Sequence, residues 1–192
     1  MILYVTKQTF ERYKLKMPED LSFPMNEIAK ATIAKESGNR LLEWGGKLFY
    51  FDGRKCIQFV NFASKLTLFL FDIKVDELPM VGNYIANYLF GIYYKDKKMI
   101  KLLKRWFEEH PACCFSKLTD KSAISTLNHT QLSFADDGNR FYDFIANGIL
   151  NTREINKMVN TDWLFTQKIN GKTEYFFTVD RFKELLTQIY EK

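Results

Sequence analysis

Little in this sequence supports a cross-linked, repetitive or disordered chain. Its 192 residues include only three Cys, four Pro and nine Gly. An odd number of cysteines, Cys56 and the adjacent Cys113 and Cys114, makes a poor framework for disulfides. The low content of Pro and Gly excludes collagen-like and low-complexity classes. We therefore expect a folded chain with free thiols, in a reducing compartment.

The sequence also lacks a long apolar run. Its most apolar stretch, residues 57–73, is interrupted by Gln58, Lys65 and Asp72 and is too polar to cross a bilayer. The first residues lack the basic and apolar regions of a signal peptide. We expect a cytoplasmic protein without a membrane partner.

Basic charge is concentrated in one segment. The formal net charge is +5, and residues 95–105 alone carry six basic side chains and one acidic side chain. The remainder of the chain is therefore neutral. A localised patch of this kind suits an anionic partner better than a uniformly basic surface would.

Motifs for cofactors and metals are missing. Residues 45–47 (Gly-Gly-Lys) lack the first glycine of a phosphate-binding loop, and they precede an expected strand instead of a helix. His110 forms an H-x-x-C-C pattern with Cys113 and Cys114, but adjacent residues of a strand point to opposite faces. Two such thiols are poorly placed to ligate one ion. We expect no metal and no cofactor.

An enzyme built on His129 is an alternative that the residues leave open. Ser122, Ser125 and His129 fall on one expected helix, and Ser125 lies four positions before His129. No nucleophile elbow is present, and a catalytic site needs three placed groups. We therefore expect a non-catalytic protein and keep an enzyme with a dispersed site around His129 as the alternative.

Apolar periodicity, caps and turns predict an α+β fold in a single domain over residues 1–192. At its centre we expect a Phe-rich meander of three antiparallel strands, with Asp52-Gly53 as a hairpin turn and Trp44 buried beside it. The three strands are expected at residues 48–51, 56–62 and 66–71.

The remaining elements follow from the same patterns. Further strands are expected at residues 2–5, 112–118, 164–169 and 174–178, the last two forming a hairpin at Asn170-Gly171. Amphipathic helices are expected at residues 7–14, 26–37, 76–92, 96–109, 122–132, 140–149, 152–159 and 180–190. Thr6 and Thr152 are the expected caps of their helices, and residues 136–139 are an expected break.

The helix at residues 96–109 is the sharpest functional feature. Its apolar stripe of Met99, Leu103, Trp106 and Phe107 is expected to be buried. The basic side chains expected on its exposed face are Lys97, Lys98, Lys101, Lys104 and Arg105.

Three interpretations of this basic face remain open. It could grip a nucleic-acid backbone, with Tyr93 and Tyr94 available for stacking. It could equally meet an acidic protein surface. A charge run is also typical of a helix face that only contacts solvent.

Several segments together resemble a known family. The segments are residues 54–61 (R-K-C-I-x-F-x-N), residues 67–70, residues 122–128 (S-A-I-x-x-L-N) and residues 159–161. In this order they resemble an uncharacterised bacterial and phage family that is described only as a domain of unknown function. The resemblance covers almost the whole chain and implies one α+β domain of cytosolic type, with no known reaction.

The resemblance also directs the functional hypothesis. It suggests an accessory protein of a bacterium, phage or plasmid. The missing catalytic motifs, the localised basic patch and the abundant Tyr and Phe indicate that this protein binds a protein or nucleoprotein partner. For a phage-borne copy, inhibition of a host defence complex of CRISPR type is the corresponding hypothesis. A nucleic-acid-binding protein that uses the basic helix 95–105 is the alternative.

Overall fold

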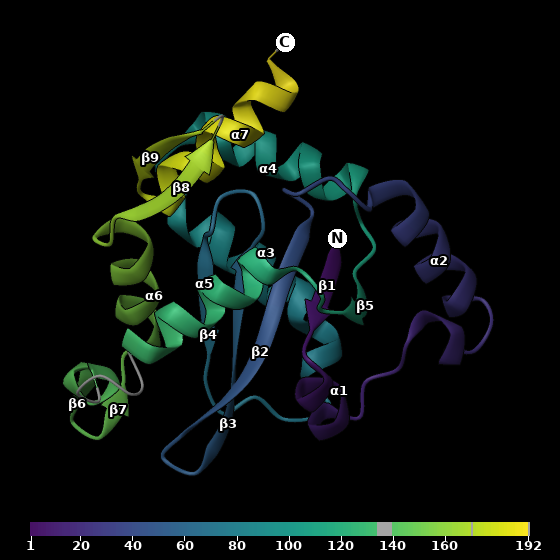
Figure 1. Cartoon of the computed structure of the whole chain (residues 1–192), viewed down its shortest axis with the longest axis horizontal. Coiled ribbons are helices and arrows are strands. Elements are labelled where there is room, and N and C mark those ends of the chain that lie inside the picture. Colours follow the sequence, from purple (N-terminus) through teal and green to yellow (C-terminus); the bar gives the residue numbers. More distant parts are fainter. Residues whose placement is uncertain (134–139, 170, 192) are drawn as a thin grey trace.

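A computed structural model describes residues 1–133, 140–169 and 171–191 (Figure 1). A mixed five-stranded sheet in the order β4-β3-β2-β1-β5 forms the centre of an α+β fold, and two hairpins, β6-β7 and β8-β9, lie outside it. The strands are β1 (Ile2–Val5), β2 (Glu43–Phe51), β3 (Arg54–Asn61), β4 (Thr67–Leu70), β5 (Cys114–Lys117), β6 (Ile145–Ala146), β7 (Ile149–Leu150), β8 (Phe165–Ile169) and β9 (Lys172–Phe176).

Helices surround this sheet. The α-helices are α1 (Lys7–Tyr13), α2 (Met25–Glu36), α3 (Val81–Ile92), α4 (Lys97–Glu109), α5 (Lys121–Gln131), α6 (Thr152–Thr161) and α7 (Thr178–Tyr190). The 3-10 helices are η1 (Pro18–Asp20), η2 (Leu78–Met80) and η4 (Arg140–Phe144). Figure 1 shows α4 and α7 together at the top of the view and α2 at one side. None of the helices in the described part of the chain is long and apolar enough to cross a membrane.

The predicted meander is confirmed. Strands β2, β3 and β4 pair antiparallel, and Asp52 and Gly53 turn with φ of 51° and 73°, as a type I′ hairpin requires. β2 begins at Glu43 and therefore contains Gly46. A Cβ at Gly46 would lie 2.6 Å from Cε1 of Phe59 and 2.8 Å from Cγ1 of Val5, so only glycine permits this close packing.

Strands β1 and β5 extend the meander into a mixed sheet. β1 pairs parallel with β2, where Leu3 lies opposite Trp44, and parallel with β5, where Leu3 lies opposite Phe115. Parallel pairing of strands so distant in sequence needs crossover connections, which here contain the helices. The strand at residues 112–118 was expected, but its place in this sheet follows only from the structure.

The two faces of the sheet pack against different helices. Trp44, Ile57 and Phe59 belong to the larger core, together with residues of α3, α4 and α7. Val60 and Phe62 pack with α5 in a separate cluster. Trp44 is completely buried, which confirms its predicted position. All three cysteines are free, as expected, and Cys113 is the exposed one.

The helix predicted at residues 140–149 is wrong. The short helix η4 ends at Phe144, and a small hairpin of β6 and β7 follows. Asn147 and Gly148 form its turn with φ of 52° and 74°. Asn-Gly is a hairpin signal, and both residues tolerate positive φ, whereas neither favours a helix interior. Phe141 is buried as expected, but Ile145 is 39% exposed.

The expected caps and turns have mixed outcomes. Thr6 caps α1, since its hydroxyl accepts a hydrogen bond from the Thr9 backbone N–H at 3.3 Å. The cap of α6 is Asn151 instead of Thr152, because Asn151 Oδ1 accepts from the Glu154 N–H at 3.2 Å. The C-terminal hairpin of β8 and β9 is present, with Gly171 at φ 79°. Its other predicted turn residue, Asn170, and the predicted break at 136–139 lie outside the described residues.

Candidate partner-binding surface

Helix α4 is positioned by a cap that joins it to α7. Asp96 Oδ1 accepts hydrogen bonds from the backbone N–H groups of Lys98 and Met99, at 3.1 and 3.0 Å. Its Oδ2 accepts a hydrogen bond from the Lys183 ammonium at 2.7 Å. The hydrogen bond from Lys183 and those from the backbone lower the pKa of Asp96. The capping carboxylate therefore stays charged at neutral pH and favours the helix N-terminus.

The apolar face of α4 is buried as predicted, with one difference. Met99, Leu103 and Trp106 are at most 1% exposed. Trp106 meets Phe182 of α7 edge to face, with ring centroids 5.8 Å apart. Phe107 is only half-buried, because it lies to one side of this stripe, where it contacts Phe90 of α3.

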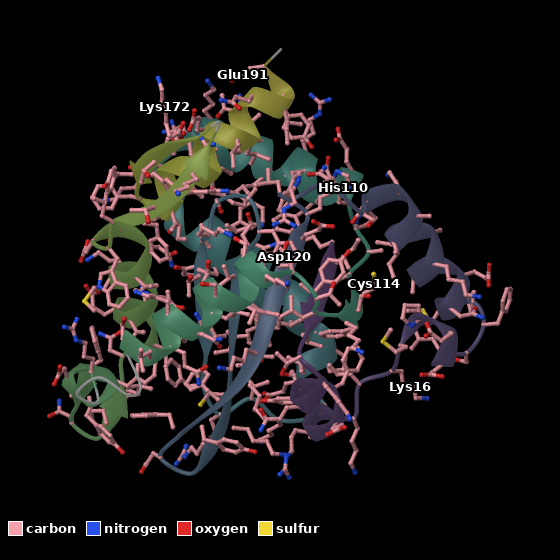
Figure 2. All side chains as sticks on the ribbon, viewed as in Figure 1. Lys16, His110, Cys114, Asp120, Lys172 and Glu191 are labelled. Carbon is pink, nitrogen blue, oxygen red and sulfur yellow. The ribbon has the colours of Figure 1, made fainter. Side chains whose placement is uncertain are left out.

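The five predicted basic residues are all exposed, but they fall into two groups. Lys98 pairs with Glu191 at the end of α7, at 2.7 Å, and Figure 2 shows Glu191 at the top of the molecule. Arg105 pairs with Glu109 at 2.8 Å, and its guanidinium lies 4.5 Å from the ring centroid of Tyr190. These two cations are therefore engaged at the contact between α4 and α7.

The second group comprises Lys97, Lys101 and Lys104, called here the lysine stripe. These side chains are exposed, and none forms an ion pair with a described residue. Their spacing of four and three positions places them along one line of the helix, about 10 Å long at 1.5 Å per residue. Glu108 is exposed and continues the same line after Lys104.

The two tyrosines expected to stack on bases differ. Tyr93 is 7% exposed, and its hydroxyl donates a hydrogen bond to the Val179 carbonyl at 2.6 Å. It is therefore a core residue, and its predicted availability for stacking is wrong. Tyr94 is 60% exposed, with the Lys95 ammonium 5.3 Å from its ring centroid.

The residues of the alternative enzyme site lie on α5. Ser125 and His129 are exposed and line a cavity of about 240 Å³ between α5 and the start of β8. The described residues show no hydrogen bond between the two side chains, and the cavity lining contains no carboxylate that could orient the imidazole. Ser122 is engaged elsewhere, since its hydroxyl accepts a hydrogen bond from the Lys65 ammonium at 2.9 Å.

The H-x-x-C-C residues face different partners. His110 Nδ1 lies 2.8 Å from Glu36 Oε1, and the other oxygen of Glu36 pairs with the Met1 amino group at 2.6 Å. The Cys114 thiol points to the Met1 carbonyl at 3.9 Å. Among residues 1–133, 140–169 and 171–191, no group of three or more His, Cys, Asp or Glu side chains is arranged to hold a metal ion.

Comparison with known proteins places the chain in a family. The family model described as domain of unknown function DUF6933 matches residues 2–180. The chain belongs to this family. The match confirms that the chain is a member of an uncharacterised family, which the segments at residues 54–61 and 122–128 had suggested. No curated protein matches the chain.

The residues that engage part of the basic face, Glu109 and Glu191, were not predicted from the sequence. Glu109 could have been found, because it stands four positions after Arg105, a spacing that favours ion pairs on a helix. Glu191 could not, since it lies 93 positions from Lys98 and reaches it only through the packing of α7 on α4. Outside the basic face, the burial of Lys65 was not predicted either. Burial lowers the pKa of its ammonium group.

Proposed function

We propose that this protein is a non-catalytic binding protein that docks its lysine stripe against an acidic surface of a protein or nucleoprotein partner. One observation carries the proposal. Lys97, Lys101 and Lys104 are exposed without ion pairs among the described residues, while Lys98 and Arg105 of the same helix are paired. Because no neighbouring carboxylate neutralises these cations, the row keeps a positive electrostatic potential. It attracts carboxylates within the screening distance of about 8 Å at physiological salt.

A rigid helix supports recognition by this row. α4 is held by the Asp96 cap and by burial of Met99, Leu103 and Trp106, so the three ammonium groups start from a fixed backbone. A partner with acidic side chains at matching spacing therefore loses little binding free energy to ordering of the surface. Electrostatic complementarity of this kind acts mainly on the association rate and on specificity.

Two features favour an acidic protein surface over a nucleic acid. Glu108 lies in line with the stripe and would repel a continuous phosphate backbone. Of the two neighbouring tyrosines, only Tyr94 is exposed for stacking. If the partner were a nucleic acid, three phosphate contacts would give a modest salt dependence, with a slope of about −2.7 for log K against log salt.

The test uses charge reversal with a matched control. Lys97→Glu/Lys101→Glu/Lys104→Glu should slow association with a helical peptide carrying Glu at positions i, i+4 and i+7 by about tenfold at low salt. The control, Lys74→Glu/Lys121→Glu/Lys172→Glu, changes the net charge equally at exposed sites on other segments. It should reduce the rate much less, as measured by stopped-flow fluorescence over a salt series.

Two outcomes would contradict this proposal. Equal slowing by both triple variants would mean that net charge acts without the stripe. Tighter binding of a 20-base-pair duplex than of the acidic peptide, strengthened further by Glu108→Gln, would support the nucleic-acid alternative. The narrower proposal of a host defence complex as partner rests on the family resemblance, and an interference assay with the stripe variant tests it.

A further inference from the structure

A second surface, independent of the lysine stripe, lies between α2 and the sheet edge at β5. It is a groove with a cavity volume of about 370 Å³, within the range of small-molecule sites. Figure 2 labels two of its lining residues, Cys114 of β5 and Lys16 on the segment between α1 and η1. The apolar residues that shape it include Leu15, Leu21, Met25, Ile28, Ala29 and Phe115.

The groove exposes two large apolar side chains of α2. Met25 is 53% and Ile28 46% exposed, although both lie on the helix that faces the sheet edge. Helix α2 reaches the sheet mainly through Ala29 and Ile33, which pack with Ile2 and Cys114. Because Ala29 is small, Met25 and Ile28 are left beside open space. An apolar ligand chain lying there would remove this surface from water.

The polar groups around the groove carry charge of one sign. Lys14 and Lys16 line it, are exposed, and form no ion pair with a described residue. Among the residues that the structure describes, no carboxylate lines it. The Thr32 hydroxyl already donates to the Ile28 carbonyl at 2.8 Å. An apolar interior with two ammonium groups complements a molecule that has an apolar chain and an anionic head.

We propose that this groove binds a single-chain anionic amphiphile, with its chain between α2 and β5 and its carboxylate or phosphate head at Lys14 and Lys16. The backbone at Lys14 is fixed, since its N–H hydrogen-bonds to carbonyls of the last turn of α1 and its φ is 51°. Both lysines therefore lie on a short, anchored segment next to the apolar lining.

Calorimetric titration of the full chain with three amphiphiles of equal chain length tests the proposal. Laurate or dodecyl phosphate should bind in a saturable 1:1 manner, and the tighter of the two identifies the head group. Dodecyltrimethylammonium should bind at least about tenfold more weakly, because the lysines repel its head. Shortening the fatty acid by two carbons should weaken binding by roughly tenfold, as expected for loss of buried methylene groups.

Two sets of variants locate the site. Ile28→Asp should weaken laurate binding by about tenfold or more, because it places a carboxylate in the apolar lining. Ala34→Asp, on an exposed position of the same helix outside the groove, should leave binding unchanged. Lys14→Gln/Lys16→Gln should weaken the binding of laurate but not of dodecanol. The control Lys7→Gln/Lys30→Gln should change the binding of neither ligand.

A second readout does not depend on variant folding. Cys113 lines the groove and is the exposed cysteine, but burial raises the pKa of its thiol to about 12, so its alkylation by N-ethylmaleimide is slow and is followed at pH 8.5. Bound laurate should slow it further in the unmodified protein. Absence of saturable binding by both anionic amphiphiles would overturn the proposal. Equally tight binding of the cationic amphiphile would overturn it as well. So would laurate binding that is unchanged in Ile28→Asp, if laurate also fails to protect Cys113 in the unmodified protein.

Discussion

Trp44 is, with Trp106, one of the two largest fully buried side chains among the described residues, and it belongs to the larger core. It is completely buried in β2 between β1 and β3, and its indole N–H has no hydrogen-bond partner among the described residues. Its contribution is therefore that of apolar volume and surface. Removing it would leave a cavity that the surrounding β-strands could fill only partly.

We expect Trp44→Ala to lower the free energy of unfolding by about 3–5 kcal/mol. Trp44→Phe should cost less, since it keeps an aromatic ring and removes an unpaired N–H. Urea denaturation followed by circular dichroism measures both changes. Tyr50→Thr, at a 48% exposed position of the same strand, is the control and should change stability by less than about 0.5 kcal/mol. A Trp44→Ala variant as stable as this control would contradict the packing argument.

Among the elements, α6 covers the β4 edge of the sheet. The Asn156 side chain accepts from the Phe69 N–H at 2.6 Å and donates to the Phe69 carbonyl at 2.9 Å. Asn160, one turn later, pairs in the same way with the N–H and carbonyl of Thr67, at 2.8 and 2.6 Å. The two amides thus replace a neighbouring strand along β4. An uncovered edge would be a template for aggregation.

We expect Asn156→Ala and Asn160→Ala each to lower the free energy of unfolding by about 1–3 kcal/mol, because buried backbone groups of β4 lose their partners. Hydrogen exchange at the amides of Thr67 and Phe69 should accelerate in the corresponding variant. Arg153→Ala, an exposed change on the same helix, should alter neither stability nor exchange. Unchanged exchange at both amides would show that α6 does not protect the edge.

In the molecule as a whole, burial makes several cysteine thiols and tyrosine hydroxyls harder to deprotonate at alkaline pH. Burial raises the pKa of Cys114 to about 11, from 9.0. Burial also raises the pKa of Tyr88 and of Tyr93 well above 10.0. In the unfolded chain these groups lose their protons at lower pH than in the folded protein. Their protonated forms therefore stabilise the fold fully only below the unfolded pKa values.

We expect the free energy of unfolding to be independent of these groups below about pH 8 and to fall as pH rises from about 9 through 11. Urea titrations in reducing buffer between pH 7 and 10.5 measure the decline. In Cys114→Ala the decline should be shallower but should begin at the same pH, because burial also raises the pKa of the Cys56 and Cys113 thiols. A stability that stays level up to pH 10.5 would contradict the burial of these groups.

Local signals in the sequence were sufficient to predict most of the helices and strands. The cap at Thr6, the turn at Asp52-Gly53 and the apolar stripe of α4 each depend on residues within a few positions of one another. They could therefore be predicted without knowledge of the fold. The wrong helix prediction at residues 140–149 also has a local cause. The helical spacing of Phe141, Phe144 and Ile145 competes with the hairpin signal of Asn147-Gly148.

The amino-acid sequence is enough to predict an α+β set of elements and one helix with a basic face. The packed fold is needed to establish that β1 and β5 join the meander, that α6 covers its β4 edge, and that Lys98 is neutralised by Glu191 while the lysine stripe is not. The reason is physical: capping and periodicity act between neighbours in the chain, whereas pairing of charges and strands depends on distances in space. Those distances are set by how the whole core packs.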